Sequence, residues 1–285
     1  MIAAALAGCG RGTVAEISGK KISRAEFVKY LEKQGGTRLL NQMLDDRLAL
    51  TMAQDKGVEP TDEQVELQLK SLKNVMDLDE EMKQRGLTLE DVKDQLRVAQ
   101  ARQNLAFRAM GKQISDEEVS KAYNQQKSQV YDIPERARVE LIGFPTKDAA
   151  DKASNKIEGG ATLQQIGEDT EIDHGPLLRR LIPKSGPGVP PGLAKAAFDT
   201  PKNQVSKPIQ VTAGKAWVIL KPEDRIPAAK MSLAEAKPLI RGQLALDKAN
   251  RDAEYLKQLR EARRVAKVKV FDPALKQVEK DFVQR

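Results

Sequence analysis

Apolar and polar residues alternate in the first predicted element of this chain, which covers residues 13–22. Val14, Ile17 and Ile22 are separated by polar positions, and Ser18-Gly19 supplies a turn between the two halves. An alternation with a period of two around a short glycine turn is typical of a β-hairpin. The sequence therefore predicts a short hairpin at this end.

Helical spacing replaces alternation after residue 22. Four helix starts carry a capping box, in which Ser or Thr precedes Glu or Gln by three residues; they are Ser23 with Glu26, Thr61 with Gln64, Ser115 with Glu118 and Ser232 with Glu235. Two apolar stripes predict amphipathic helices; they consist of Leu39, Leu40, Met43, Leu44, Leu48 and Leu50, and of Leu87, Leu89, Val92, Leu96, Leu105 and Phe107. We expect such stripes to lie in the core.

Methionine is frequent in these helices, at Met43, Met52, Met76, Met82 and Met110. Flexible methionine side chains can fill gaps in a core, and they can also line an adaptable groove for unfolded protein. The core is the more common role, and the groove is the functional alternative.

The last sixty residues predict a helix followed by a strand. Apolar spacing indicates a helix over residues 233–262, and residues 265–270 alternate as Val-Ala-Lys-Val-Lys-Val. No neighbouring segment could pair with that strand, so we expect it to pair with residues 14–17 and to close a discontinuous domain. The residues after Asp272-Pro273 form either a short helix or a frayed tail.

Composition limits the classes of function. The 285 residues carry a net charge of +7, with 31% charged and 4% aromatic side chains, which indicates a soluble, helix-rich protein. Basic residues are not interleaved with stacking aromatics, so no nucleic-acid partner is expected. The charge is a solvated face that would also favour an anionic membrane. His174 is the only histidine and is expected in a solvated turn, so neither a metal site nor a cofactor is predicted.

The single cysteine has an informative setting. Leu6-Ala7-Gly8-Cys9 resembles a bacterial lipobox, in which the cysteine is lipidated, although only eight residues without Lys or Arg precede it. Either the natural start lies upstream or the match is chance. We expect lipidation at Cys9 and an extracytoplasmic location, in the periplasm or on the outer face of the cell membrane. No other segment approaches the ~20 apolar residues of a membrane span.

Residues 189–220 combine an apolar helix, the strand Val-Ser-Lys-Pro-Ile at 205–209, a glycine turn at Gly214 and a last strand at 217–220. This succession resembles the closing half of a parvulin domain, and residues 137–142 resemble its opening strand. The resemblance covers about residues 134–225. It implies a small FKBP-like antiparallel sheet with helices.

The same resemblance implies a proline pocket formed by Val189, Leu193 and Phe198. It places Glu140 and Ala216 at the positions of the two catalytic histidines, so both histidines are missing. Isomerisation of an X-Pro amide must overcome a barrier of about 18–20 kcal/mol, and a pocket that only binds does not lower it. Glu140 is expected to be a solvated strand residue; the alternative is an acid–base group whose pKa is raised by burial.

Other segments resemble a second family. "VAEISGKKISRAEF", "LLNQMLDDRLALTMAQDKGVEPTDEQV" and the residues from Met231 to Phe271 resemble the chaperone domain of the PrsA and SurA foldases. An α+β fold is therefore expected. We predict a signal remnant and tether at 1–12, a helical chaperone domain at 13–133, a parvulin-like domain at 134–227 and a C-terminal helix and strand at 228–285 that complete the chaperone domain.

Two functions from different classes fit these observations. The first is a binding protein, an exported and lipid-anchored folding factor for unfolded secreted or envelope proteins, whose parvulin-like module has little or no catalysis. The second is an active peptidyl-prolyl cis-trans isomerase that uses other polar groups. A factor dedicated to one secreted partner is a weaker third hypothesis. A homodimer is left open.

Overall fold

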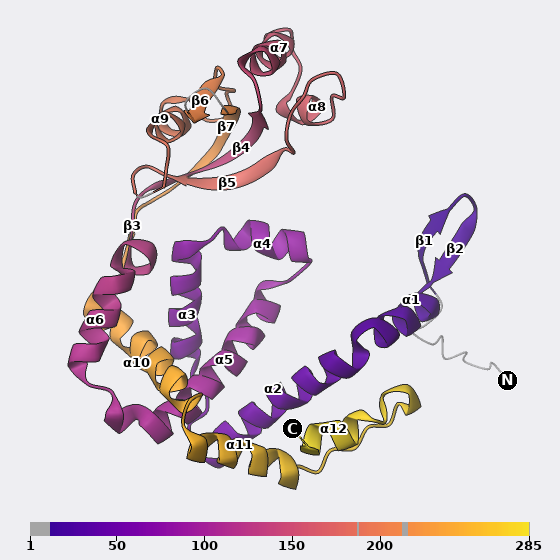
Figure 1. Cartoon of the computed structure of the whole chain (residues 1–285), viewed down its shortest axis with the longest axis vertical. Coiled ribbons are helices and arrows are strands. Elements are labelled where there is room, and N and C mark those ends of the chain that lie inside the picture. The colour runs from indigo at the N-terminus through magenta and orange to yellow at the C-terminus, as the bar shows by residue number, and fades with distance from the viewer. Residues whose placement is uncertain (1–11, 187, 213–215, 285) are drawn as a thin grey trace, which may run out of the picture. The chain divides into compact units, whose positions relative to one another are not determined.

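The computed structural model describes residues 12–186, 188–212 and 216–284 (Figure 1). Cys9 and Gly214 lie outside the described residues. The chain forms two compact units. Unit 1 takes the described parts of Met1–Val65, Lys93–Ile114 and Arg241–Arg285, and unit 2 takes Glu66–Val92 and Ser115–Ile240. Three helices, α3, α5 and α10, contribute residues to both units.

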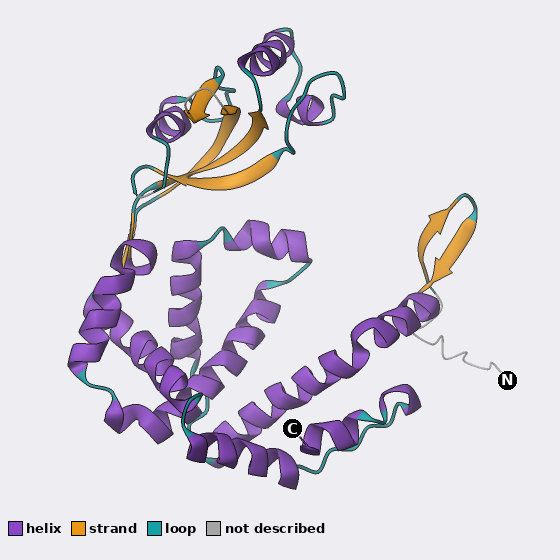
Figure 2. Cartoon of the chain, in the orientation of Figure 1, coloured by secondary structure: helices purple, strands orange, loops and turns teal. Residues whose placement is uncertain are grey.

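Unit 1 is mostly helical, with one hairpin (Figure 2). Its strands are β1 (Thr13–Ile17) and β2 (Lys20–Ser23). Its helices are α1 (Arg24–Leu31), α2 (Thr37–Asp55), parts of α3 (Asp62–Val75), α5 (Leu89–Met110) and α10 (Leu233–Ala249), α11 (Ala253–Val265) and α12 (Val278–Gln284). A π-helical turn at Glu32–Gly36 links α1 to α2, and 3₁₀ turns lie at Gly111–Gln113 and Pro273–Leu275.

The predicted hairpin is confirmed. β1 pairs antiparallel with β2, and the turn residues Ser18 and Gly19 both have positive φ, 49° and 77°. Two positive φ angles in succession are the geometry of the tight turn whose twist matches a hairpin. The hairpin and α1 are solvated throughout, since every residue from 12 to 31 is exposed.

The four predicted helix starts are also confirmed. The Ser23 and Thr61 hydroxyls accept the backbone N–H three residues later, at 3.2 and 3.3 Å. Ser115 and Ser232 do the same at 3.1 and 3.3 Å, and Glu118 and Glu235 accept the Ser N–H in return. Such caps satisfy N–H groups that no residue within the helix can bond.

The stripe on α2 is less buried than expected. Ala49 and Ala53 lie in the core with Ala101 and Leu105 of α5, whereas Met43 is 62% exposed. Leu39 is also exposed. The small residues Ala49 and Ala53 of α2 therefore lie in the core, while Leu39 and Met43 of the first two turns face solvent and Leu40 and Leu44 are half-buried.

The predicted strand at 265–270 is wrong, and so is its pairing with residues 14–17. Residues 266–270 belong to no strand, and β1 pairs with β2 instead. Side chains near α12 satisfy the backbone of Val270: its N–H donates to the Glu279 carboxylate at 2.6 Å, and its carbonyl accepts from Lys276 Nζ at 2.9 Å. The alternation reflects burial of Val270 on one side of an extended segment.

The predicted helix over 233–262 is two helices. α10 ends at Ala249, and the Asp252 carboxylate accepts the Tyr255 N–H at 2.7 Å to begin α11. An aspartate in this position favours a new helix start over continuation. Of the two alternatives for the residues after Asp272-Pro273, the helix is observed. α12 buries Val278 and Phe282.

Unit 2 contains a four-stranded antiparallel sheet in the order β5-β4-β7-β6. These strands are β4 (Arg136–Phe144), β5 (Leu178–Pro183), β6 (Ile209–Thr212) and β7 (Ala216–Ile226). The other elements are α4 (Leu78–Arg85), α6 (Asp116–Gln126), α7 (Lys147–Glu158), α8 (Leu163–Gly167), α9 (Pro191–Asp199), β3 (Asp132–Ile133) and β8 (Ala229–Lys230), with a π-helical turn at Lys127–Tyr131.

Helices cover both faces of this sheet (Figure 1). On one face, Ile142 and Phe144 of β4 pack with Ile219 of β7 against α7 and α8. The opposite face packs against α9. Strand residues alternate between the two faces, so the face on which a residue of β4 or β7 lies follows from its position. The mixed fold of helices and small antiparallel sheets is the α+β fold expected.

The two ends of the sheet module lie side by side. β3 pairs antiparallel with β8, with Asp132 opposite Lys230 and Ile133 opposite Ala229. Just outside this pair, the Tyr123 hydroxyl donates to the Met231 carbonyl at 2.9 Å, and Tyr123 stacks on Tyr131 with ring centroids 5.0 Å apart. The chain therefore enters and leaves the module through one two-stranded stem.

Candidate functional site

The three predicted pocket residues lie together. Val189, Leu193 and Phe198 are half-buried, and all three pack against one apolar cluster on the α9 face of the sheet. Leu193 and Phe198 come from α9, which Pro190 and Pro191 begin. Val189 comes from the segment just before the helix. The structure confirms that these side chains share one cluster, whereas proline binding there stays a prediction.

We call this set the α9 cluster. Its strand residues are all apolar: Ala137, Val139, Leu141, Ile182, Val218 and Leu220. The strand residues therefore form an apolar surface beneath α9. β7 also brings a cation beside α9, since the Arg225 guanidinium carbon lies 4.6 Å from the Phe198 ring centroid.

Glu140 does not face this cluster. It lies one residue after Val139 and one before Leu141, so strand alternation turns its side chain to the other face of the sheet. Ala216 is half-buried at the first position of β7, opposite Thr212. The two residues at the predicted histidine positions therefore lie on different faces and form no common site.

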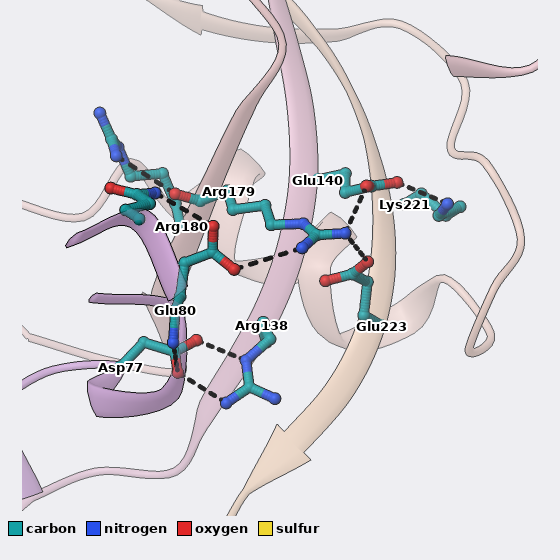
Figure 3. Close-up of polar contacts among 9 residues, drawn as sticks. Asp77, Glu80, Arg138, Glu140, Arg179, Arg180, Lys221 and Glu223 are labelled. Carbon is teal, nitrogen blue, oxygen red and sulfur yellow. Dashed lines mark hydrogen bonds and ion pairs between the residues drawn. The ribbon is translucent and has the colours of Figure 1, made fainter. Parts of the chain in front are cut away.

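Glu140 belongs instead to an ion network across the sheet (Figure 3). It lies between Lys221 of β7 and Arg179 of β5, its direct cross-strand neighbours. Its carboxylate contacts Lys221 Nζ at 2.5 Å and an Arg179 nitrogen at 3.1 Å. With a side chain only 13% exposed, Glu140 is not the solvated residue that was expected. Burial alone would raise the pKa of this carboxyl, but the hydrogen bonds from Lys221 and Arg179 outweigh it and lower the pKa.

Arg179 is the centre of the network. Besides Glu140, its guanidinium contacts Glu223 of β7 at 3.3 Å and Glu80 of α4 at 3.2 Å. The hydrogen bonds that Arg179 donates, first to Glu140 and then to Glu80, raise the pKa of its guanidinium. The guanidinium of Arg179 thus joins β4, β5 and β7 to α4. Its planar arrangement of several donors suits it to this role.

A second arginine fixes the start of α4. Arg138 of β4 forms a two-point ion pair with Asp77, and this pair raises the pKa of Arg138 (Figure 3). Asp77 is also the N-cap of α4, accepting the Glu80 N–H at 3.4 Å. The polar half of this sheet face therefore holds α4 in place. We call these ion pairs the clamp, because each charged group in them already has a partner and they join the sheet to α4.

Sequence reasoning missed two cations beside Phe198. The Arg225 guanidinium carbon lies 4.6 Å from the ring centroid, and Lys184 Nζ lies 5.4 Å from it. Arg225 also donates to the Phe198 carbonyl at 3.1 Å, while Lys184 pairs with Glu135 at 2.9 Å. Arg225 lies near the end of β7 and Lys184 just after β5, and only the fold brings both cations to the Phe198 ring.

The environment of His174 differs from the solvated turn that was expected. Its ring is half-buried, with nitrogens 2.6 Å from the Gly175 carbonyl and 2.9 Å from the Asp169 carbonyl, and it packs edge-on near Phe144. It is a structural link within a loop rather than a solvated turn residue.

Unit 1 contains three adjoining cavities, of about 320, 270 and 460 Å³. Met52 of α2 lines all three, and Tyr255 and Leu259 of α11 each line two. Leu105 of α5 closes two of them. The rims carry both signs of charge, for example Lys56 and Glu254. Of the five methionines, Met110 is buried in the core and Met52 lines these cavities, whereas a methionine-lined groove for unfolded protein stays a prediction.

Comparison with known proteins defines the class of the module. Residues 114–238 match the profile of the family described as the PPIC-type PPIASE domain. This region of the chain is therefore a parvulin-type peptidyl-prolyl isomerase domain by family, as its sequence motifs indicated.

The relatives extend the likeness to most of the chain. It is 22% identical over 271 residues to foldase protein PrsA of Clostridium botulinum strain Loch Maree, covering 90% of this chain and 79% of that protein. It is 25% identical over 243 residues to the putative peptidyl-prolyl cis-trans isomerase YacD of Bacillus subtilis, covering 82% and 78%. The crystal structure of PrsA from Bacillus subtilis aligns with 95% of this chain and 98% of its own, at 18% identity and a TM-score of 0.38. The chain is thus similar in sequence to the PrsA foldases over most of its length. Among the described residues, no helix has the length and apolar character needed to span a membrane.

Proposed function

We propose that this protein is an extracytoplasmic folding factor that binds unfolded secreted or envelope proteins, and that its parvulin-type module has little or no isomerase activity. One observation carries the second part of the proposal. The strand side chains packed beneath Val189, Leu193 and Phe198 are apolar, and Glu140, at one of the predicted histidine positions, lies on the other face. Such a surface can hold a proline ring, but Glu140 does not face a twisting amide bound there, and the Arg225 guanidinium beside Phe198 already donates to the Phe198 carbonyl.

The cavities of unit 1 support the first part. A factor that accepts many clients needs an apolar surface whose side chains adapt, and Met52 lies where three cavities adjoin. Charges of both signs at the rims suit segments of varied sequence. We propose that apolar side chains of extended client segments enter here.

Two measurements on the purified chain test these parts separately. Exchange NMR on short X-Pro peptides should show interconversion at the spontaneous rate, and suppression of aggregation of a reduced, unfolded protein should be lost in Met52→Asp with Leu259→Asp. The matched control is Met43→Asp, also on α2 and 62% exposed. Isomerisation well above the spontaneous rate would contradict the binding-only module, and unchanged suppression in the double variant would contradict the client site.

An active isomerase is the second candidate, and Arg225 favours it. A fixed cation beside the pocket can stabilise charge that develops on the prolyl amide as it twists. If this candidate holds, catalysis should fall at least tenfold in Arg225→Met with Leu193 left intact. A rate that stays unchanged would exclude Arg225 from catalysis.

Lipidation of Cys9 belongs to the same proposal, and its support is the lipobox-like sequence. Expression in a bacterium from an upstream start should give a membrane-associated product with an acylated N-terminus, and Cys9→Ser should abolish the acylation. A soluble product with Cys9 intact would contradict it.

A further inference from the structure

The hairpin and α1 form an exposed apolar segment at the start of unit 1. Five of its large side chains are solvated to an unusual extent: Ile17 is 70% exposed, Tyr30 60%, Leu31 47%, Phe27 44% and Val28 39%. Apolar side chains that are gathered in this way on a soluble protein usually mark an interaction surface. We call residues 13–31 the N-terminal platform.

The platform has a distinct apolar side on its hairpin. Ala15 lies opposite Ile22 and Ile17 opposite Lys20, so these four side chains share one face of the two-stranded sheet. Glu16 and its partner Lys21 occupy the other face. The apolar face therefore has a lysine at its edge.

Helix α1 also combines apolar side chains with positive charge. Phe27, Tyr30 and Leu31 are spaced by three and four residues, which places them on one side of the helix. Arg24 and Lys29 add positive charge to the same short helix. Residues 13–31 carry four basic and two acidic side chains, so their net charge is +2.

We propose that the N-terminal platform binds the surface of an anionic lipid bilayer. An element with exposed aromatic and aliphatic side chains and adjacent lysines inserts the former between headgroups and attracts acidic lipids with the latter. Charge selects this occupant over an uncharged surface. The sequence adds a positional argument, because the four residues from Cys9 to Thr13 span at most about 14 Å. A lipid on Cys9 would hold the platform within that distance of the membrane.

Vesicle sedimentation tests the proposal. The full chain carrying Cys9→Ser, so that no acyl chain contributes, is mixed with vesicles of phosphatidylcholine alone or of phosphatidylcholine with phosphatidylglycerol. We expect binding to the anionic vesicles only, and weaker binding as salt is raised. Phe27→Gln with Leu31→Gln should reduce partitioning about tenfold. Lys20→Gln with Lys29→Gln should reduce it about 25-fold, at about fivefold per charge.

Matched controls come from the same unit. Phe271 is 81% exposed, so Phe271→Gln removes an equally apolar solvated ring outside the platform. Lys267→Gln with Lys269→Gln removes two solvated charges. These variants should bind as the parent does, and circular dichroism should show that every variant stays folded.

Four results would overturn the proposal. The first is no binding to anionic vesicles, and the second is an equal loss in the control variants. The third is a parent that self-associates in sedimentation velocity and separates in Phe27→Gln while vesicle binding is unchanged, which would assign the platform to a second copy of the chain. Loss of aggregation suppression in Phe27→Gln without loss of vesicle binding would assign it to client protein. The platform variants and the cavity variants change different surfaces. Absence of vesicle binding would therefore contradict the membrane proposal without affecting the proposed function.

Discussion

Arg179→Met provides a quantitative test of the ion network. The substitution keeps the aliphatic stem and removes the three contacts to Glu80, Glu140 and Glu223, at 3.2, 3.1 and 3.3 Å. Glu140 keeps Lys221, whereas Glu80 and Glu223 lose this cation. Exposed ion pairs contribute about 0.2–1 kcal/mol, and breaking a fully buried pair costs about 3–5 kcal/mol. The Arg179 side chain is 34% exposed and the three carboxylates are 13–23% exposed, so we expect a loss of about 2 kcal/mol.

Urea unfolding followed by tryptophan fluorescence measures this loss. Trp217 is the only tryptophan, and it packs on the core beneath α7, so its emission reports the unfolding of unit 2. Arg180→Met is the matched control, because Arg180 is exposed and its guanidinium donates to the Arg179 carbonyl; it should cost less than about 0.5 kcal/mol. Equal losses in the two variants would refute the assignment of Arg179 as the clamp.

The difference in unfolding free energy between the parent and Arg179→Met should depend on pH through Glu140. Its pKa is lowered in the folded protein from the usual 4.5, so its contribution to stability is complete above pH 4.5 and disappears as the pH falls through the lower folded value. The gap in unfolding free energy between the parent and Arg179→Met should therefore be widest near neutral pH and narrow below pH 4.5. A gap that widens on acidification would show that the sign of the coupling is wrong.

Three further predictions concern single features. Leu193→Asp should weaken binding of X-Pro peptides at least tenfold in titrations, while Lys195→Asp on the exposed side of α9 should not; equal affinities would remove the pocket assignment. The Glu235 carboxyl should titrate at a pKa of about 2 by NMR, because the Ser232 N–H and hydroxyl and then Lys70 stabilise its charged form, and Ser232→Ala should move this pKa upward; an unshifted value would contradict the cap. A chain that joins residue 133 directly to residue 229 should unfold cooperatively if the module is an insertion, and a product that binds the dye ANS without a cooperative transition would count against it.

Local signals predicted the elements well, because their causes are local. A Ser or Thr three residues before Glu or Gln bonds the backbone of its own turn, so the helix starts at Ser115 and Ser232 could be read directly. Partners remote in sequence could not be. The alternation at 265–270 describes which side of the segment is buried and says nothing about its hydrogen-bond partners, which turned out to be Lys276 and Glu279.

The candidate site shows the same limit at the scale of one residue. Because side chains alternate along a strand, an assignment shifted by one position moves a residue to the opposite face. Glu140 was placed at the pocket from a family resemblance, but Val139 is the residue of β4 that faces α9 at this level. The apolar members Leu193 and Phe198 were found because α9 carries both, whereas Arg225 reaches Phe198 only through the fold.

The stem of β3 and β8 has a mechanical consequence. Its strands are antiparallel and adjacent, so tension applied at residues 131 and 231 would pull both strands from the same end. The pairs Asp132–Lys230 and Ile133–Ala229 would then open one after the other, as a zipper does, instead of resisting together in shear. The module would yield first at its stem, leaving β4 and the sheet core shielded from the load.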